Sequence, residues 1–371
     1  MKVALVYDRV NKFGGAERVL LQLHKLFPDA PLFTLVYQPA TTPWANNFKI
    51  FCSPFNKISF FRSHHELLAP LAIFGFELLN LTNFDIVISV TSEAAKSVIT
   101  PPETLHICYC LTPTRYLWSE ESIYAKDWKM RYFPRRLIDK LKKTDIVTAQ
   151  RPDAYIAISK EVQQRIKTYY HRDSSIVYPP VGDYFFKTKL QPQCARDYYL
   201  VVSRLVSYKK VDLVIKAFTN LKQKLIIVGS GTEDKYLHSI ASPNVSFIES
   251  ASDNQLRHLY SHAKAVIFPQ VEDYGIVPLE AQAAGTPVIA LSLGGALETI
   301  IPYQTGVFFK TQTVQSLLSA VKKFEETMSL YSPQSCRTHA RQFSESRFAN
   351  QFSAKVKALL LEYRTGQDKN L

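Results

Sequence analysis

The chain has 371 residues, 46% of them apolar, which is more than one hydrophobic core usually supports and excludes a disordered or fibrous protein. Its net charge of +13 is spread along the chain, with 23 Lys and Arg against 16 Asp and Glu in residues 1–180 and 22 against 16 in residues 181–371, so a basic tail is excluded. Such an excess attracts nucleotide diphosphates, nucleic acid or an anionic membrane, although solubility is the simpler explanation of charge alone.

Short apolar runs typical of strands alternate with helical patterns along the chain. The expected strands are Val3–Tyr7, Leu32–Tyr37, Asp85–Val90, His106–Tyr109, Ala154–Ile158, Tyr199–Ser203, Lys224–Val228, Val245–Ile248, Ala265–Phe268 and Val288–Leu291. The expected helices include Ala16–Phe27, Glu161–Tyr170, Val211–Thr219, Val277–Ala284, Val314–Phe324 and Ser346–Tyr363. The alternation indicates βαβ units, and near-continuous Val, Ile and Leu indicates parallel strands buried on both faces.

A stretch rich in proline, Tyr178–Asp197, interrupts this pattern and has the composition of a linker. We therefore expect an α/β fold of two Rossmann-like, doubly wound domains that face each other across a cleft. The expected parts are an N-terminal domain over residues 1–180, a linker over 181–197, a second domain over 198–345, and a C-terminal helix over 346–371 that packs back on the first domain. Ligands of doubly wound sheets bind at the carboxyl ends of the strands, so functional motifs should follow strands.

The five cysteines are scattered, which implies no disulfide framework and suits a reducing, cytoplasmic setting. Cys108 and Cys110 are separated by one residue, which is not a usual zinc spacing. The longest uncharged apolar run, Leu67–Phe76, contains Pro70 and is far shorter than the roughly 20 residues of a spanning helix. We expect a chain that does not cross a membrane and holds no metal.

Gly14 and Gly15 follow the first expected strand and open a helix. Glycines there let the backbone approach a ligand closely, and the helix N-terminus offers N–H groups to an anion. The sequence lacks a full G-x-G-x-x-G, so a dinucleotide site is poorly supported, and an ordinary strand-to-helix turn explains the pair equally well.

Arg204 and Lys209 follow the first strand of the second domain. Two cations at a strand end can converge on one diphosphate and stabilise the negative charge that builds up as a sugar–phosphate bond breaks. Taken alone, a solvated basic turn is a simpler explanation.

The segment from Glu272 to Glu280 carries the sharpest pattern, because two carboxylates flank a glycine turn that opens a helix at Pro278. The turn places the backbone N–H groups of Gly275, Ile276 and Val277 where a phosphate could bind. Glu272 could accept hydrogen bonds from sugar hydroxyls, and Glu280 from a ribose.

The segment Glu272–Ala290 resembles the signature of glycosyltransferase family 4, whose members are retaining group 1 glycosyltransferases of the two-domain GT-B fold. Further similarity lies in Arg204 with Lys209, in Gly14 with Gly15, and in the Gly294–Thr299 segment. The runs Thr112–Trp118 and Tyr208–Asp212 resemble a branch of bacterial mannosyltransferases that use GDP-mannose in polysaccharide synthesis. The resemblance extends over nearly the whole chain.

The resemblance implies roles for individual residues. Arg204 and Lys209 would bind the donor diphosphate, Glu272 the transferred sugar and Glu280 the ribose. Donor contacts would also come from the backbone of Gly275, Ile276 and Val277 and from the loop that contains Gly229. The acceptor, a saccharide or polyprenyl-linked saccharide, would lie near Gly14, Gly15 and Arg115. Members of this fold generally need no metal, and the donor phosphate is thought to serve as the base toward the acceptor.

One position departs from the family pattern. The residue before Thr112-Pro113 is usually a histidine near the reacting sugar, whereas here it is Leu111, which cannot donate a hydrogen bond or carry a proton. His106 lies inside the expected strand and is not an obvious substitute. The departure supports an alternative in which the chain is a non-catalytic sugar-nucleotide binder that partners an active transferase.

Other functional classes have less support. A transferase that uses a UDP-sugar stays open, whereas a sugar-nucleotide epimerase would need acid and base residues that the sequence does not offer. A nicotinamide oxidoreductase is disfavoured by the missing glycine motif, and nucleic-acid binding rests on net charge alone. The segment Arg115–Lys143 is basic and rich in aromatic residues, which suits either a peripheral contact with the inner, anionic face of a membrane or a solvated helix.

Overall fold

The computed structural model describes residues 1–63, 69–119, 135–192 and 196–368, and it divides into two compact units. The first unit comprises Met1–Tyr178 and Ala349–Leu371, and the second comprises Pro179–Phe348. The segment expected as a linker, residues 181–197, therefore belongs to the second unit, where Val181 pairs with Ser344 and a 3₁₀ turn covers Asp183–Lys187.

The first unit contains a seven-stranded parallel sheet with the order β3-β2-β1-β4-β5-β6-β7. Its strands are β1 (Val3–Tyr7), β2 (Leu32–Thr34), β3 (Ile50–Cys52), β4 (Ile86–Thr91), β5 (Leu105–Cys110), β6 (Ala154–Ala157) and β7 (Ser175–Ile176). Its helices are α1 (Gly15–Leu26), α2 (Ser59–Ser63), α3 (Ala72–Glu77), α5 (Arg135–Thr148) and α6 (Lys160–Tyr170). Strands β1, β4 and β5 are buried along their whole length, as their largely apolar sequences predict.

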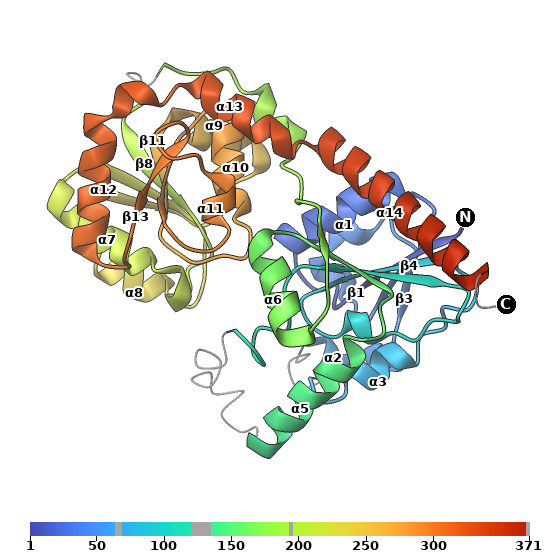
Figure 1. Cartoon of the computed structure of the whole chain (residues 1–371). Helices are drawn as coiled ribbons and strands as arrows, with labels where there is room; N and C mark the ends of the chain where they lie inside the picture. Colours follow the sequence, from blue (N-terminus) through green and yellow to red (C-terminus); the bar gives the residue numbers. More distant parts are fainter. Residues whose placement is uncertain (64–68, 120–134, 193–195, 369–371) are drawn as a thin grey trace. The chain divides into compact units, whose positions relative to one another are not determined.

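The long helix α14 (Glu345–Asp368) ends the described chain, and its residues from Ala349 onward belong to the first unit (Figure 1). The Tyr363 hydroxyl donates to the backbone oxygen of Pro102 at 2.6 Å, and the Phe352 ring packs edge-on against Tyr109 of β5 with centroids 5.4 Å apart. These contacts fix the C-terminal helix against the first sheet.

The second unit repeats the arrangement with a six-stranded parallel sheet of order β10-β9-β8-β11-β12-β13. Its strands are β8 (Tyr198–Val202), β9 (Lys224–Val228), β10 (Val245–Ile248), β11 (Ala263–Phe268), β12 (Val288–Leu291) and β13 (Gly306–Phe309). Its helices are α7 (Val211–Leu221), α8 (Asp234–Ser239), α9 (Asp253–His262), α10 (Ile276–Ala283), α11 (Ala296–Thr299), α12 (Val314–Glu326) and α13 (Pro333–Ala340). The order 3-2-1-4-5-6 in chain sequence is that of a doubly wound fold.

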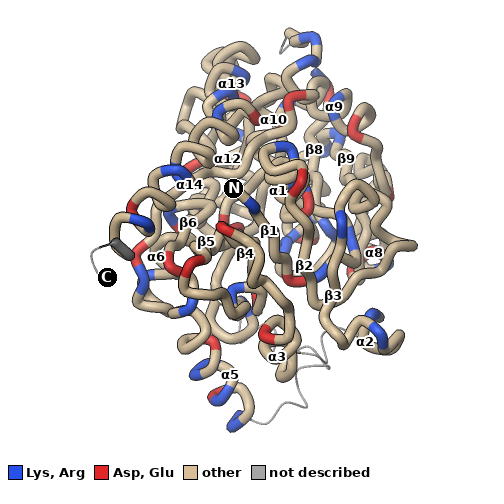
Figure 2. Tube along the Cα trace, turned by 90° about the vertical axis from the view of Figure 1, so that its right-hand side faces the viewer, with Lys and Arg blue, Asp and Glu red and all other residues tan. Residues whose placement is uncertain are grey.

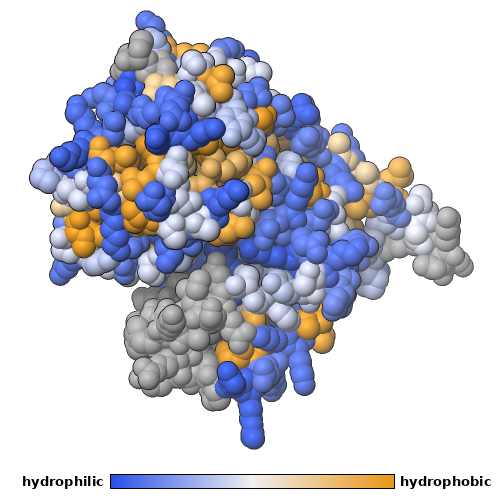
Figure 3. Space-filling view, turned by 60° about the vertical axis from the view of Figure 1, so that its left-hand side comes forward, coloured by the Kyte–Doolittle hydropathy of each residue, from blue (hydrophilic) through white to orange (hydrophobic). Residues whose placement is uncertain are grey.

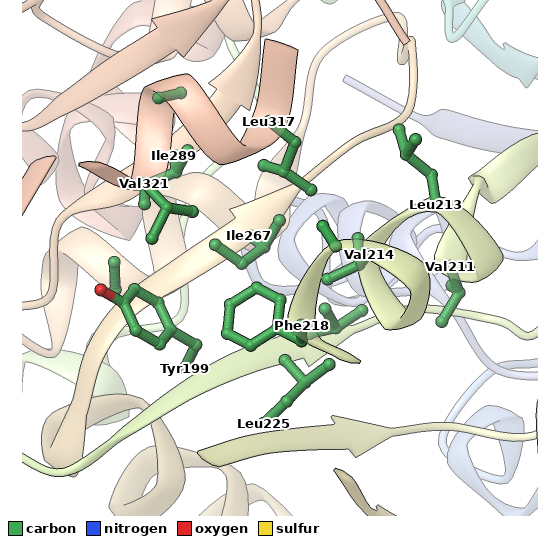
Figure 4. Packing of buried hydrophobic residues seen from close by; sticks show 14 of the residues in the cluster. Tyr199, Val211, Leu213, Val214, Phe218, Leu225, Ile267, Ile289, Leu317 and Val321 are labelled. Carbon is green, nitrogen blue, oxygen red and sulfur yellow. The ribbon is translucent and has the colours of Figure 1, made fainter. Parts of the chain in front are cut away.

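One apolar cluster fixes helices α7 and α12 on the second sheet (Figure 4). Phe218 of α7 stacks edge-on against Tyr199 of β8, with ring centroids 5.1 Å apart, while Leu317 and Val321 of α12 enter the same cluster. Both helices show the apolar spacing that buries one face.

Polar residues cover much of the outer surface, with hydrophobic ones in patches between them (Figure 3).

The fold class expected from the sequence, α/β with two doubly wound units, is confirmed. Four of the expected strands have the bounds that the sequence predicted, and the ends of the others differ by one to three residues; for example, the expected Leu32–Tyr37 ends at Thr34. Strands β3, β7 and β13 were not expected, because each is short and pairs with the sheet along a single edge.

Candidate functional site

The order of the second sheet reverses between β8 and β11, which lie side by side although three connections separate them in the chain. Two neighbouring parallel strands whose connections run in opposite directions leave a crevice at their carboxyl ends, where ligands of such sheets bind. The loop after β8 carries Arg204 and Lys209, and the loop after β11 carries Glu272 and Gly275. The topology therefore brings together the two motifs that the sequence singled out.

Lys209 and Glu272 form an ion pair across this crevice. Lys209 ends a short 3₁₀ turn, and Lys210 then adopts the left-handed conformation from which α7 begins. The side chains are 11% and 17% exposed, respectively, so both charges are largely removed from water while still being reachable. A partly buried cation beside a carboxylate can exchange that partner for another anion at modest cost in desolvation.

Arg204 lies just beyond β8 and is exposed. Its Nη2 donates to the Tyr208 hydroxyl at 2.6 Å, and the ring of Tyr208 also lies 5.1 Å from the Nζ of Lys209. Tyr208 thus contacts both cations of the predicted diphosphate pair and holds them on the same loop. Sequence reasoning assigned Tyr208 no role of its own, although the run Tyr208–Asp212 was part of the family resemblance.

Gly275 begins helix α10 in the left-handed conformation, with φ of +86°. Residues other than glycine rarely adopt this conformation, so the turn depends on glycine. The N-cap residue is this glycine, so no N-cap side chain bonds to the first turn of the helix, where the N–H groups of Ile276 and Val277 lie. The first turn of a helix therefore presents N–H groups beside Lys209 and Glu272, as an anion site requires.

A second glycine pair supports the Glu272 loop from the end of β12. The Gly295 N–H donates to the backbone oxygen of Glu272 at 2.8 Å. A Cβ on Gly294 would lie 2.5 Å from that same oxygen, and a Cβ on Gly295 would lie 2.3 Å from the oxygen of Tyr274. Because these contacts allow no side chain, the two glycines position Glu272. The resemblance included this pair but assigned it no function.

Gly229 fixes the relation between the loops after β8 and β9. It has φ of +143°, and a Cβ there would lie only 1.9 Å from the backbone oxygen of Ser203. The close approach explains why glycine is needed at this position through packing alone. Its expected contact with the donor stays a prediction.

Glu280 is buried in α10, and its Oε2 accepts a hydrogen bond from the Tyr260 hydroxyl at 2.9 Å. The ribose contact expected of Glu280 stays a prediction. Tyr260 orients the carboxylate and was not recognised from the sequence.

The first sheet has its own switch point between β1 and β4, and its strand ends carry polar residues that sequence reasoning missed. Arg9 donates two hydrogen bonds to Glu93, each of 2.6 Å. Asp8 is buried and accepts hydrogen bonds from the Thr91 hydroxyl and the Ser92 and Ala95 N–H groups. Burial raises the pKa of Asp8, and the neighbouring Glu93 raises it further. The only sequence signal was that these residues directly follow strands.

Gly14 and Gly15 lie where α1 begins, close to the end of β1. Gly14 has an extended backbone, and a Cβ at Gly15 would contact nothing within 4 Å. A Cβ on Gly14 would lie 3.3 Å from Oε2 of Glu17, which is a tight contact, so packing explains Gly14 in part. Close approach of a ligand is one reason for glycine at position 15, and the acceptor contact expected of the pair stays a prediction. Glu17, in the first turn, accepts a 2.6 Å hydrogen bond from the Tyr7 hydroxyl and is buried.

Leu111 directly follows β5, and its N–H donates to the backbone oxygen of Thr91. Arg115 is half-buried in the same loop, and both residues follow the carboxyl end of β5. His106 lies near the opposite end of β5, roughly 16 Å away along the strand, and its Nε2 is paired with Ser89 Oγ at 2.8 Å. His106 therefore does not replace the family histidine.

Among the described residues, no group of three or more His, Cys, Asp or Glu side chains is placed to hold a metal ion. Within the same ranges, no helix is long and apolar enough to span a bilayer. Of the basic, aromatic segment Arg115–Lys143, residues 120–134 lie outside the described part of the chain.

Most of the second unit matches a known protein family. Residues 185–343, which carry every part of the crevice described above, match the family "Glycosyl transferases group 1". The matched region is 43% of the chain by length, and it contains Arg204, Lys209, Glu272 and Glu280.

Curated relatives match parts of the chain. An uncharacterized glycosyltransferase of Methanocaldococcus jannaschii is 32% identical over 148 residues, which cover 37% of this chain and 38% of that protein. An alpha-1,3/1,6-mannosyltransferase of Homo sapiens is 27% identical over 233 residues, which cover 54% of this chain and 56% of that protein. The chain thus spans about half or less of the length of these relatives.

Solved structures match over nearly the whole chain. Sucrose-phosphate synthase from Thermosynechococcus elongatus has a TM-score of 0.75 at 16% identity, covering 98% of this chain and 100% of its own. The Anabaena protein HepE in complex with UDP has a TM-score of 0.74 at 18% identity, covering 96% and 100%. At these identities the likeness shows the fold, which is GT-B.

Proposed function

We propose that the whole chain is a retaining family 4 glycosyltransferase that transfers mannose from GDP-mannose, building on the match of residues 185–343 to the group 1 family. The observation that carries the proposal is the joining of Arg204, Lys209, Glu272 and the N-terminus of α10 at the switch point of the second sheet. Two cations and a helix N-terminus can bind a diphosphate, and the adjacent carboxylate can bind sugar hydroxyls.

In this proposal the donor diphosphate replaces Glu272 as the partner of Lys209. Glu272 can then accept hydrogen bonds from hydroxyls of the sugar. The bond between the anomeric carbon and the diphosphate oxygen breaks, and the acceptor oxygen bonds to that carbon on the same face while its proton passes to the leaving diphosphate. Lys209, Arg204 and the α10 N-terminus stabilise the charge that grows on the diphosphate.

Mannose is proposed because a mannosyltransferase is among the relatives that match beyond the second unit, and because the runs Thr112–Trp118 and Tyr208–Asp212 resemble the GDP-mannose branch. A UDP-sugar is the alternative donor, since a solved structure with this fold holds UDP. Both nucleotides present the same diphosphate to Lys209, so the choice depends on the base and the sugar.

A non-catalytic sugar-nucleotide binder is the second candidate function. It is favoured by Leu111, which stands at the end of β5 where the family pattern has a histidine, and by the distance of His106 from that end. Such a protein would keep Lys209 and Glu272 for binding and would work as the partner of an active transferase.

The proposed acceptor is a saccharide or a polyprenyl-linked saccharide bound at the carboxyl ends of β1 and β4, near Gly14, Gly15 and Arg115. The proposed setting is cytoplasmic synthesis of a cell-surface polysaccharide such as lipopolysaccharide, at the inner face of the membrane. No resident metal and no nucleic acid are part of the proposal.

The test is turnover of four donors, GDP-mannose, UDP-glucose, UDP-GlcNAc and UDP-galactose, followed as release of the nucleoside diphosphate with and without candidate acceptors. GDP release that depends on Lys209 supports the mannosyltransferase, and UDP release that depends on Lys209 supports the alternative donor. Nucleotide binding without turnover favours the non-catalytic binder. If no donor is turned over and neither GDP nor UDP shifts the melting temperature, the proposed function is wrong.

A further inference from the structure

Large hydrophobic side chains are exposed in one short part of the first unit. Five of the seventeen exposed large hydrophobic residues of the described chain lie between positions 58 and 78. They are Ile58, Phe60, Leu71, Phe74 and Leu78, which are 43–64% exposed. Single exposed apolar residues are common on soluble proteins, but a concentration of this kind usually marks an interaction surface.

Helix α3 is apolar on two opposite faces. Ala72, Gly75 and Phe76 are buried against the core of the first unit, whereas Leu71, Phe74 and Leu78 recur at a spacing of three and four residues and are exposed. An ordinary surface helix carries polar residues on its outer face. The outer face of α3 therefore needs an apolar neighbour other than this sheet.

The segment before α3 belongs to the same surface. Phe55 packs edge-on against Phe61 of α2 with centroids 6.1 Å apart, and a Cβ on Gly75 of α3 would lie 2.9 Å from the Phe55 ring. Phe55 therefore packs against both α2 and α3. Phe60, whose ring centroid lies 5.8 Å from that of Phe61, is 51% exposed and adds a further exposed apolar side chain from α2.

Basic residues flank this apolar surface. Figures 1 and 2 both show α5 beside α3 in the first unit, and Arg151, just after α5, forms an ion pair of 2.5 Å with Glu77 of α3. The exposed charged residues of α5 are four basic and one acidic, and Lys57 is exposed before α2. The four basic residues are Arg135, Arg136, Lys140 and Lys143, and the acidic one is Asp139.

We propose that the outer face of α2 and α3, together with the basic face of α5, is a docking surface for an anionic lipid bilayer. The apolar side chains would enter the boundary between headgroups and acyl chains, and the cations of α5 would bind lipid phosphates. A second copy of the chain is a poorer occupant, because two such basic faces would repel each other. This inference rests on the membrane location included in the proposed function, and it names the residues that would make the contact.

The test is co-sedimentation of the full chain with vesicles of phosphatidylglycerol and phosphatidylcholine, compared with vesicles of phosphatidylcholine alone. The variant Phe74→Gln/Leu78→Gln removes two apolar side chains that are 58% and 64% exposed. Its matched control, Leu330→Gln/Leu361→Gln, changes two residues that are 52% and 66% exposed and belong to none of α2, α3 and α5. A second pair compares Lys140→Gln/Lys143→Gln with Lys235→Gln/Lys322→Gln, all at exposed positions.

The wild type is expected to bind the anionic vesicles and to bind neutral vesicles much more weakly. The Phe74/Leu78 variant and the Lys140/Lys143 variant should each lose about tenfold or more in affinity, while both controls bind as the wild type does. The proposal is wrong if the wild type ignores anionic vesicles, if the controls lose as much as the variants, or if the Phe74/Leu78 change instead abolishes self-association measured by light scattering. Binding of GDP and UDP by the same variants, read from melting temperature in the absence of lipid, separates failure of this surface from failure of the proposed donor site.

Discussion

Each unit holds a lysine–carboxylate ion pair close to the carboxyl ends of its strands, and the two pairs differ in what surrounds them. In the first unit Lys96 pairs with Asp145 at 2.6 Å, with side chains 2% and 7% exposed. In the second unit Lys209 pairs with Glu272, with side chains 11% and 17% exposed. The two ion pairs are chemically similar and lie at corresponding places in related sheets, but the side chains of the second pair are more exposed to solvent.

The first pair is enclosed by further hydrogen-bond donors. Asp145 also accepts from the Thr114 hydroxyl at 3.1 Å, the Trp118 indole at 2.8 Å and the Tyr170 hydroxyl at 2.9 Å. Burial lowers the pKa of Lys96, but the attraction of Asp145 outweighs it and raises that pKa overall. A network with this many partners joins the loop after β5 to α5 and α6, and we assign it to stability.

The second pair lies at the switch point between β8 and β11, where glycine-dependent turns surround it. Gly275, Gly294 and Gly295 set the backbone around Glu272, and the N-terminus of α10 lies beside it. We therefore interpret a partly exposed ion pair beside a helix N-terminus as a candidate anion-binding site. A fully enclosed ion pair with several further hydrogen bonds is interpreted as part of a structural network.

The largest effect should come from breaking the enclosed pair. Lys96→Ala leaves the Asp145 carboxylate buried without its cation, so the free energy of unfolding should fall by about 3–5 kcal/mol. Lys96→Met/Asp145→Asn removes both charges and should cost less. Chemical denaturation followed by fluorescence, with Trp118 close to the change, measures both. A loss under about 1 kcal/mol for Lys96→Ala would show that the network is not structural.

Breaking the second pair should affect chemistry more than stability. Lys209→Ala should slow release of the nucleoside diphosphate about 10²–10³-fold, since a fixed cation at a developing oxyanion contributes this much. Its unfolding free energy should fall by less than that of Lys96→Ala, because the Lys209 and Glu272 side chains are 11% and 17% exposed and therefore less desolvated. The control is Lys264→Ala, which breaks the Lys264–Glu325 pair near the other end of β11. Equal turnover by the two variants would remove Lys209 from the site.

The first unit should also carry a specific sensitivity to acid. Burial lowers the pKa of His106 to about 3, with the charges of Arg151 and Arg172 acting in the same direction. Below pH 6.5 the His106 imidazole is protonated in the unfolded chain but stays neutral in the folded chain down to about pH 3. The free energy of unfolding therefore falls as pH decreases, by about 1.4 kcal/mol for each pH unit over this range. Between pH 6.5 and 5 the loss should be about 2 kcal/mol.

The control for this prediction is His106→Gln, which cannot titrate. Its unfolding free energy should depend less steeply on pH over the same range. Identical slopes for the two proteins would mean that another group carries the sensitivity.

The smallest expected effect concerns the turn at Gly275. A Cβ there would lie no closer than 3.4 Å to Phe268, so Gly275→Ala should cause no clash. The left-handed backbone, with φ of +86°, alone should cost about 1–2 kcal/mol of unfolding free energy. Gly295→Ala, whose Cβ would lie 2.3 Å from the Tyr274 oxygen, should cost more and should also raise KM for the donor. The order of the two losses, measured by denaturation, checks the geometry.

Much of the fold could be predicted from the sequence because many of its strands are largely apolar runs of four or more residues. Val3–Tyr7, Lys224–Val228, Val245–Ile248 and Val288–Leu291 have the same bounds in the structure as in the sequence prediction. Edge strands such as β3 and β7 have only two or three residues, which is too short for a periodic signal.

The pairings in the sites could not be predicted, because they depend on sheet order. Lys209 meets Glu272 only because β8 and β11 are neighbours, and Arg9 meets Glu93 because β1 and β4 are neighbours. Single residues such as Asp8 and Tyr260 carry no local pattern at all. Their partners become visible only once the strands are arranged.

The most direct measurement is calorimetric titration of GDP and UDP into the wild type, Lys209→Gln and Lys264→Gln. The ion pair of Lys209 with Glu272 is interpreted as a donor diphosphate site, so the wild type and Lys264→Gln should bind one of the nucleotides with equal affinity. Lys209→Gln should bind it about tenfold or more weakly, as expected for loss of a charge-assisted contact to phosphate. Equal binding by all three proteins, or binding by none, would contradict the assignment of the donor site to this pair.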